Sequence, residues 1–208
     1  MKVALTRPAG RNEQLAQRLR AAGHDVVEVP LIETEPIGDT PIDVTAYDWV
    51  VVTSATGARE LRRRMRGEPR RVAAIGRATA DAFGRADLVP RVSTQEGLLA
   101  EFPRHPGRVL FAGAEDARRE LVDGLDAEFV PLYRTRAVAP REPLHADIVV
   151  LASPSAARSL AAVRTDLAVV TIGPETTGAA RELGLEVLRE ATTHDLDGLF
   201  DAVISAAR

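Results

Sequence analysis

Six short segments of this 208-residue chain combine hydroxyl side chains, glycine and proline in patterns that could bind an anion. They are 6–10, 54–57, 76–79, 113–116, 153–155 and 173–176. Any one of them is explained as a helix cap, because Ser, Thr and Asp are ordinary N-cap residues. Six together indicate more, because each helix N-terminus offers unpaired N–H groups and a partial positive charge. They predict a ligand with several carboxylates or phosphates.

Other chemistries lack the residues that they need. The chain has no cysteine, which excludes a disulfide framework, a thiolate metal site and a Cys nucleophile. The four histidines are scattered without metal-ligand spacing, so we expect exposed loop residues and no metal at His24, His105, His145 and His194. No dinucleotide fingerprint, Walker-type loop or Gly-x-Ser-x-Gly elbow is present. We therefore expect no cofactor.

Composition places the chain among cytoplasmic globular proteins. With 45% hydrophobic and 27% charged residues it can bury a core. No apolar stretch approaches the ~18 residues that span a bilayer, and the N-terminal apolar run is too short for a signal peptide. The net charge of −3 argues against a nucleic-acid-binding surface over the whole protein but permits a local basic cleft. The arginine-rich run 59–71 has no interleaved aromatic residues, and we interpret it as a solvated helix face.

The elements that must position these segments form an α/β pattern. Apolar runs alternate with amphipathic stretches, which is typical of βαβ units and a parallel sheet. The expected strands are 2–6, 26–30, 49–53, 72–75, 88–92, 108–111, 128–132, 148–152, 168–172 and 186–189. The expected helices are 14–22, 57–64, 78–85, 117–124, 156–163, 177–183 and 196–206. Functional loops of such sheets follow the carboxyl ends of the strands.

The pattern repeats after about half of the chain. Residues 51–59 match 150–158, 74–80 match 171–177, and 93–99 match the run 192–199. Residues 29–34 match 130–135 in the same order, so the matches predict an internal duplication. Two segments, 31–36 and 133–140, are extended, partly polar and closed by prolines, and we expect them to be linkers rather than core strands.

The motifs taken together resemble the uroporphyrinogen-III synthase family. The resemblance is carried by Leu5-Thr6-Arg7-Pro8, Val52-Thr53-Ser54, Ile75-Gly76 with Thr79, Leu110-Phe111-Ala112-Gly113, Val130-Pro131-Leu132-Tyr133-Arg134-Thr135, Ala152-Ser153-Pro154-Ser155 and Ile172-Gly173-Pro174 with Thr176. It implies two flavodoxin-like parallel-sheet domains joined by a two-segment extended linker, with the active site in the cleft between them. The first domain would combine 1–33 with 137–208, the second would span 38–133, and 34–37 and 134–136 would be linkers.

The resemblance also implies an activity. The family closes hydroxymethylbilane, a linear tetrapyrrole with eight carboxylates, to uroporphyrinogen III with loss of water and inversion of ring D. It uses no cofactor. The implied protein is a cytoplasmic monomer of haem or cobalamin biosynthesis that takes its substrate from solution or by hand-over from hydroxymethylbilane synthase. Neither nucleic acid nor membrane is an expected partner.

Site residues are carried over by matching motifs. Tyr133 matches the family's tyrosine and is the expected proton or hydrogen-bond donor to the departing hydroxyl; the alternative is a linker residue that packs between domains. The expected substrate-binding residues are Arg7, Ser54, Gly76, Thr79, Gly113, Ser153, Gly173 and Thr176. Glu175 departs from the pattern, because some members have Thr there.

Two alternatives stay open at this point. A non-catalytic, synthase-like ligand-binding or regulatory module would share the fold, although the end of the chain at Arg208 leads us to expect no attached DNA-binding domain. A flavodoxin-like electron carrier would be yellow. Residues 53–57 faintly resemble a flavodoxin phosphate loop, but they do not follow the first strand. Aromatic residues are only 4% of the chain, so few side chains are available to stack on a flavin.

Overall fold

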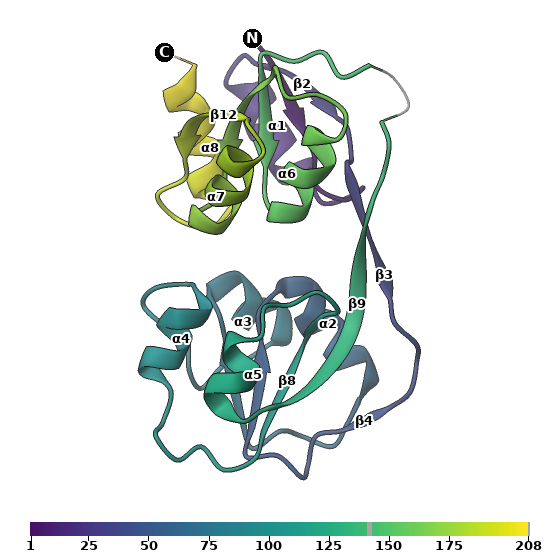
Figure 1. Ribbon diagram of the computed structural model, residues 1–208, viewed down its shortest axis with the longest axis vertical. Coiled ribbons are helices and arrows are strands. Elements are labelled where there is room, and N and C mark those ends of the chain that lie inside the picture. The colour runs from purple at the N-terminus through teal and green to yellow at the C-terminus, as the bar shows by residue number, and fades with distance from the viewer. Residues whose placement is uncertain (141–142, 208) are drawn as a thin grey trace. The chain divides into compact units, whose positions relative to one another are not determined.

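A computed structural model describes residues 1–140 and 143–207 of the chain (Figure 1). The chain folds as two compact units. Unit 1 consists of Met1–Thr34 with Thr135–Arg208, and unit 2 consists of Glu35–Arg134. Arg141, Glu142 and Arg208, which the first expected domain includes, lie outside the described residues. Within the described ranges no helix is long and apolar enough to cross a membrane.

Unit 1 is a parallel sheet covered on both faces. Its order is β12-β11-β10-β1-β2, and every neighbouring pair is parallel. The strands are β1 (Lys2–Leu5), β2 (Asp25–Glu28), β10 (Ile148–Leu151), β11 (Ala168–Thr171) and β12 (Glu186–Glu190). All four residues of β10 are buried, as is typical of a central strand with helices on both sides.

Alternating side chains of these strands make two separate cores. Val150 packs in one core with α1 (Glu13–Ala21) and α8 (Leu196–Ala206). Leu151, the next residue, packs in the other core with α6 (Pro154–Ala161) and α7 (Pro174–Glu182). The period of two along a strand thus sends neighbouring side chains to opposite layers.

Unit 2 repeats this architecture. Its sheet has the order β3-β9-β8-β5-β7, and β9, β8, β5 and β7 are parallel neighbours. The strands are β3 (Ile32–Pro36), β5 (Trp49–Val52), β7 (Arg71–Ala74), β8 (Val109–Ala114) and β9 (Glu128–Ala137). One core contains α2 (Ala55–Arg64) and α3 (Arg77–Phe83), and the other contains α4 (Gln95–Glu101) and α5 (Glu120–Leu125). A separate two-stranded sheet pairs β4 (Ile42–Asp43) with β6 (Met65–Arg66).

The two units share one spatial order although the chain enters them differently. Unit 1 follows the flavodoxin-like order 2-1-3-4-5 when its strands are counted along the chain. In unit 2 the same order appears when β8 and β9 are counted as the first two strands and Leu88, which bridges Ala73, marks the fifth. The first two strands of each half of the sequence therefore join the last three strands of the other half. The expected α/β fold with two parallel-sheet domains is confirmed.

The two segments expected to be linkers are hydrogen-bonded strands. β3 and β9 are neighbours, the Ile37 N–H donates to the Leu132 carbonyl (2.8 Å) and the Val138 N–H donates to the Leu31 carbonyl (2.9 Å). The polar residues of these segments suggested linkers, but a strand pair can keep polar side chains in solvent while its backbone groups bond each other. Only the expectation that these segments are not strands was wrong, because the partner strand is about a hundred residues away in sequence. The chain does pass from one unit to the other within them.

Three further expectations differ from the structure. The expected strand 88–92 is reduced to the bridge at Leu88, and α4 was not expected at all. The arginine-rich face is not wholly solvated, because Arg64 is only 8% exposed. Its guanidinium donates to the carbonyls of Thr40 (3.1 Å) and Ile37 (2.9 Å), so the end of α2 faces backbone that follows β3.

Candidate active site

The parallel sheets gather most of the predicted site residues at the carboxyl ends of the strands. In unit 1 these ends precede the segments with Arg7, Ser153, Gly173 and Thr176. In unit 2 they precede or include Ser54, Gly76, Thr79, Gly113 and Tyr133. Each unit thus presents one edge rich in hydroxyl and backbone N–H groups, which is the ordinary place for a ligand in open α/β sheets.

Tyr133 makes a hydrogen bond that the sequence did not reveal. Its Oη lies 2.8 Å from Oγ of Ser54, and either oxygen could be the donor. Ser54 is the N-cap of α2, and its Oγ also accepts from the Gly57 N–H (2.9 Å). The chain thus places a phenol and an alcohol in direct contact at the start of a helix in unit 2.

The surroundings of Tyr133 keep its phenol protonated. The residue is 8% exposed, and burial is the largest influence, raising the pKa of Tyr133 above its usual value. The hydrogen bond with Ser54 lowers this pKa, and the negative charge of Asp116 raises it. Tyr133 is therefore a proton donor rather than a base near neutral pH.

One close approach and one shift in strand register determine where the Tyr133 ring lies. A Cβ on Gly57 would lie 3.1 Å from Ser54 Oγ and 3.6 Å from Tyr133 Cε1, so a side chain there would crowd both partners. The register of β8 and β9 shifts between Gly113 and Ala114, and the shift pairs Ala114 with Tyr133. A bulge re-aims the side chains of the strand that carries it.

Gly113 was expected at the start of a helix, but it lies in a strand. Gly113 and Ala114 belong to β8, and α5 begins only at Glu120 instead of the expected residue 117. A Cβ on Gly113 would meet the Phe111 ring at 3.2 Å. Glycine at this position thus leaves space for an aromatic ring, and the acidic pair that follows suggested a helix start that the backbone does not adopt.

The edge of unit 1 has caps and no tyrosine. Ser153 is the N-cap of α6, and its Oγ accepts from the Ala156 N–H at 3.2 Å. Arg7 lies after β1, where its Nη1 donates to the Arg11 carbonyl. Asn12 is fully buried and its Nδ2 donates to the Arg7 carbonyl at 3.2 Å, which fixes the backbone of this loop.

Gly76 and Gly173 are N-caps of α3 and α7 with extended backbones that any residue could adopt. What requires glycine is a neighbouring side chain. A Cβ on Gly76 would lie 3.0 Å from Ser93 Oγ, and one on Gly173 would lie 2.8 Å from His194 Cδ2. His194 is exposed as expected, but its ring lies against a predicted binding loop. The signal was the repeat, in which Ser93 and His194 both precede the N-cap of a helix by one residue.

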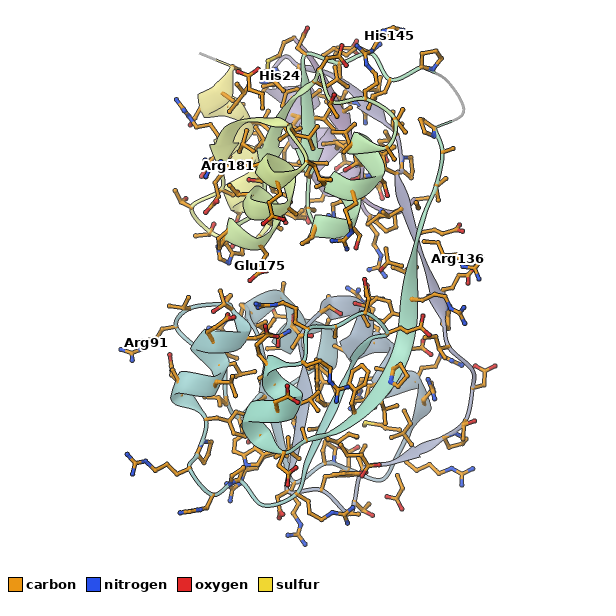
Figure 2. All side chains as sticks on the ribbon, in the orientation of Figure 1. His24, Arg91, Arg136, His145, Glu175 and Arg181 are labelled. Carbon is orange, nitrogen blue, oxygen red and sulfur yellow. The ribbon has the colours of Figure 1, made fainter. Side chains whose placement is uncertain are left out.

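Thr79 and Thr176 occupy equivalent positions, three residues after these N-cap glycines, and are 5% and 2% exposed. Little of either residue is accessible, so their contribution to binding would be limited to small contacts. Figure 2 shows Glu175 and Arg181 at opposite ends of α7, with the carboxylate in the first turn. Of the other histidines, His24 is half-buried rather than exposed, and its Nδ1 has no hydrogen-bond partner among residues 1–140 and 143–207.

Comparisons with known proteins agree on one family. A family model described as "Uroporphyrinogen-III synthase HemD" matches residues 13–201. The chain is 27% identical to a uroporphyrinogen-III synthase of Synechococcus elongatus over 99% of its length and 95% of that protein. It is 31% identical to a putative uroporphyrinogen-III synthase of Archaeoglobus fulgidus over 98% and 96%. A crystal structure of a mutant uroporphyrinogen III synthase from Thermus thermophilus has a TM-score of 0.61 at 17% identity, with 100% and 98% coverage, and shares the fold.

Proposed function

The chain belongs to the uroporphyrinogen-III synthase family, and on this premise we propose that it closes hydroxymethylbilane to uroporphyrinogen III. The reaction loses the terminal hydroxyl as water and inverts ring D. The observation that carries the proposal within this chain is Tyr133, a buried and protonated phenol at the carboxyl edge of the unit 2 sheet. It supplies the one proton donor that the leaving hydroxyl needs.

The first chemical step is loss of water from the hydroxymethyl group. The C–O bond breaks as Tyr133 passes its proton to the departing oxygen, and a reactive azafulvene remains. Ring D attacks it through its substituted carbon, forms a spiro intermediate, reopens and recloses inverted. A positioned acid contributes about a hundredfold to ten-thousandfold to such a step. No second strong acid or base is required.

The larger task is to hold the substrate in one conformation. Hydroxymethylbilane closes without enzyme to the non-inverted isomer, so the protein must favour one arrangement of reacting carbons and exclude the other. Orientation of this kind can contribute several kcal/mol to a barrier. A sheet with short loops at one edge is suited to it, because each loop leaves a fully buried strand, as after β5 and β10.

Substrate carboxylates provide the points of attachment. We assign them to Arg7, Ser153, Gly173 and Thr176 in unit 1 and to Gly76, Thr79 and Gly113 in unit 2. Ser153, Gly76 and Gly173 are N-caps, where helix backbone N–H groups can donate to carboxylates. Arg7 adds a guanidinium, whose charge strengthens hydrogen bonds to a carboxylate. Glu175 lies in the first turn of the same helix as Thr176, where its negative charge would weaken carboxylate binding unless the side chain points outward.

Product analysis tests the proposal. The purified protein is incubated with freshly prepared hydroxymethylbilane, the products are oxidised, and the uroporphyrin isomers are separated by chromatography. We expect isomer III in large excess over isomer I. A product in which isomer I dominates, as in the reaction without protein, would remove the proposed activity and leave a non-catalytic module with the same fold.

A further inference from the structure

The Ser54 hydroxyl is half-buried and already has two hydrogen-bond partners within unit 2. It accepts from the Gly57 N–H at 2.9 Å and lies 2.8 Å from Tyr133 Oη. A serine hydroxyl has one proton to donate and two positions at which it accepts. Because Gly57 uses one acceptor position, Ser54 can either donate its proton to Tyr133 or accept a proton from it.

The two directions have different chemical consequences. If Tyr133 donates to Ser54, its only proton is bound inside the protein and cannot reach a substrate. If Ser54 donates to the Tyr133 oxygen, the phenol proton is free to point away from α2. Only the second direction leaves Tyr133 available as a proton donor, while Oγ still caps the helix through Gly57.

We infer that Ser54 is a positioning residue, which donates its proton to Tyr133 Oη and thereby directs the Tyr133 O–H to the departing hydroxyl of the substrate. The inference rests on the proposed function for its substrate, but the hydrogen bond itself does not. Gly57 completes the arrangement, because a side chain on it would lie 3.1 Å from Ser54 Oγ and 3.6 Å from the Tyr133 ring.

The same bond stabilises the charge that develops during the step. When the substrate C–O bond breaks, the Tyr133 proton leaves with the hydroxyl as water and Tyr133 becomes a phenolate. A hydrogen bond to an ionised oxygen is roughly twice as strong as one between neutral groups. The Gly57 N–H polarises Ser54 and strengthens its donation further. The proton that the tetrapyrrole releases from a ring carbon at closure returns to Tyr133.

Unit 1 shows that capping alone does not need this arrangement. Ser153 caps α6 in the same way, with Ala156 in the place of Gly57. Ile32 matches Tyr133 in the repeat and has no oxygen to receive a proton. Ser153 thus has the capping half of the Ser54 geometry without the positioning half.

A double-mutant cycle separates positioning from direct substrate binding. Ser54→Ala should lower turnover about tenfold, which is the loss expected for one hydrogen bond to a charged group. In a Tyr133→Phe background the same change should have almost no effect, because the group on which it acts is gone. Ser54→Thr keeps a hydroxyl at the N-cap and should restore most of the turnover. Equal losses in both backgrounds would mean that Ser54 contacts the substrate directly, and would overturn the inference.

A matched control accounts for the lost cap. Thr94 is the N-cap of α4 in the same unit, its Oγ1 accepts from the Gly97 N–H at 3.0 Å, and it has no role in the proposed chemistry. Thr94→Ala should lower thermal stability to a similar extent as Ser54→Ala without the tenfold loss of turnover. If Thr94→Ala reduces turnover equally, the effect of Ser54→Ala is structural and the inference fails.

Titration of Tyr133 reports whether Ser54 donates to the phenolate, without any turnover. The chain has two tyrosines, so Tyr47→Phe leaves Tyr133 as the only phenol to follow by ultraviolet absorbance. Removing a donor to the phenolate, by Ser54→Ala in this background, should raise the observed pKa. A lowered or unchanged pKa would show that Ser54 does not donate to the phenolate, and would overturn the inference. This result stands even if the protein fails to make isomer III, so failure of the inference and failure of the proposed function are distinguishable.

Discussion

The two units have the same scaffold and differ at one chemically decisive position. In each, a serine caps the helix that follows the third strand, with Oγ accepting from the N–H three residues later at 2.9 Å in unit 2 and 3.2 Å in unit 1. Opposite Ser54 stands Tyr133, whereas the matching residue of unit 1 is Ile32, which packs in the same core as Ala156. Both units thus have a serine-capped helix start, and unit 2 adds a phenol in contact with the capping serine.

The largest effect on turnover is expected when the phenol oxygen of Tyr133 is removed. Tyr133→Phe should lower turnover about a hundredfold or more, because the leaving hydroxyl loses its acid. Unfolding should change little, since the ring stays in place. Steady-state rates measure the first and thermal denaturation the second.

The matched change in unit 1 is Ile32→Val. It should cost about 1 kcal/mol of stability, as core truncation by one methylene does, and should leave turnover near the wild-type value. If Ile32→Val and Tyr133→Phe affected turnover alike, the two units would not differ in the way described.

The N-cap glycines Gly173 and Gly76 allow the two units to be compared by the stability that each loses on substitution. Gly173→Ala places a Cβ 2.8 Å from His194 Cδ2 and should destabilise the protein by about 1–3 kcal/mol. Gly76→Ala meets Ser93, with Oγ at 3.0 Å and Cβ at an ordinary 3.5 Å, and should cost less because a serine hydroxyl can rotate away. Denaturant unfolding measures both.

A second variant shows whether His194 causes the difference. In a His194→Ala background, Gly173→Ala should lose most of its cost, because the ring against which the new Cβ would pack is absent. A cost that persists undiminished would place its origin in the backbone of α7 instead.

Exchanging Gly57 and its counterpart Ala156 should separate catalysis from helix stability. Gly57→Ala should lower turnover about threefold to tenfold by crowding the Ser54–Tyr133 bond. The thermal stability of Gly57→Ala should not fall in proportion to its turnover, because alanine is a better helix former than glycine by about 1 kcal/mol. Ala156→Gly should lose stability while turnover is retained. A Gly57→Ala protein with full turnover would remove the importance of the close approach.

The smallest effect is expected in the pH dependence of stability. The raised pKa of Tyr133 means that folding favours the neutral phenol. This contribution is fully present below the usual phenol pKa of about 10 and is lost as pH rises through the higher pKa of the folded protein. Because the pKa of Tyr47 is also raised by burial, the measurement uses Tyr47→Phe protein. Urea midpoints at alkaline pH should fall less once Tyr133 is also replaced by Phe.

Much of the fold could be predicted from local patterns. Buried runs such as Trp49–Val52 and Ile148–Leu151 can be recognised in the sequence, because both faces of a central parallel strand are apolar. The repeat alone, however, would divide the chain near residues 103–107 into two successive domains. The exchange of strands between the halves depends on pairings such as β1 with β10, and no local pattern reports them.

The site was predictable in composition but not in geometry. Motifs pointed to Ser54 and Tyr133 separately, yet 79 residues separate them and nothing in either segment indicates their hydrogen bond. The sequence correctly predicts His194 as an exposed loop residue, but it does not report the approach of His194 to Gly173, which joins loops that follow different strands. Gly113 was misplaced because a glycine followed by acidic residues has the composition of a helix start, whereas the strand continues through it.

The central claim is that this chain directs ring closure toward the inverted isomer. The most direct test is the ratio of isomer III to isomer I formed from fresh hydroxymethylbilane, with and without the protein. We expect isomer III to dominate with wild-type protein and the share of isomer I to rise with Tyr133→Phe. A wild-type ratio equal to that of the protein-free reaction would contradict it.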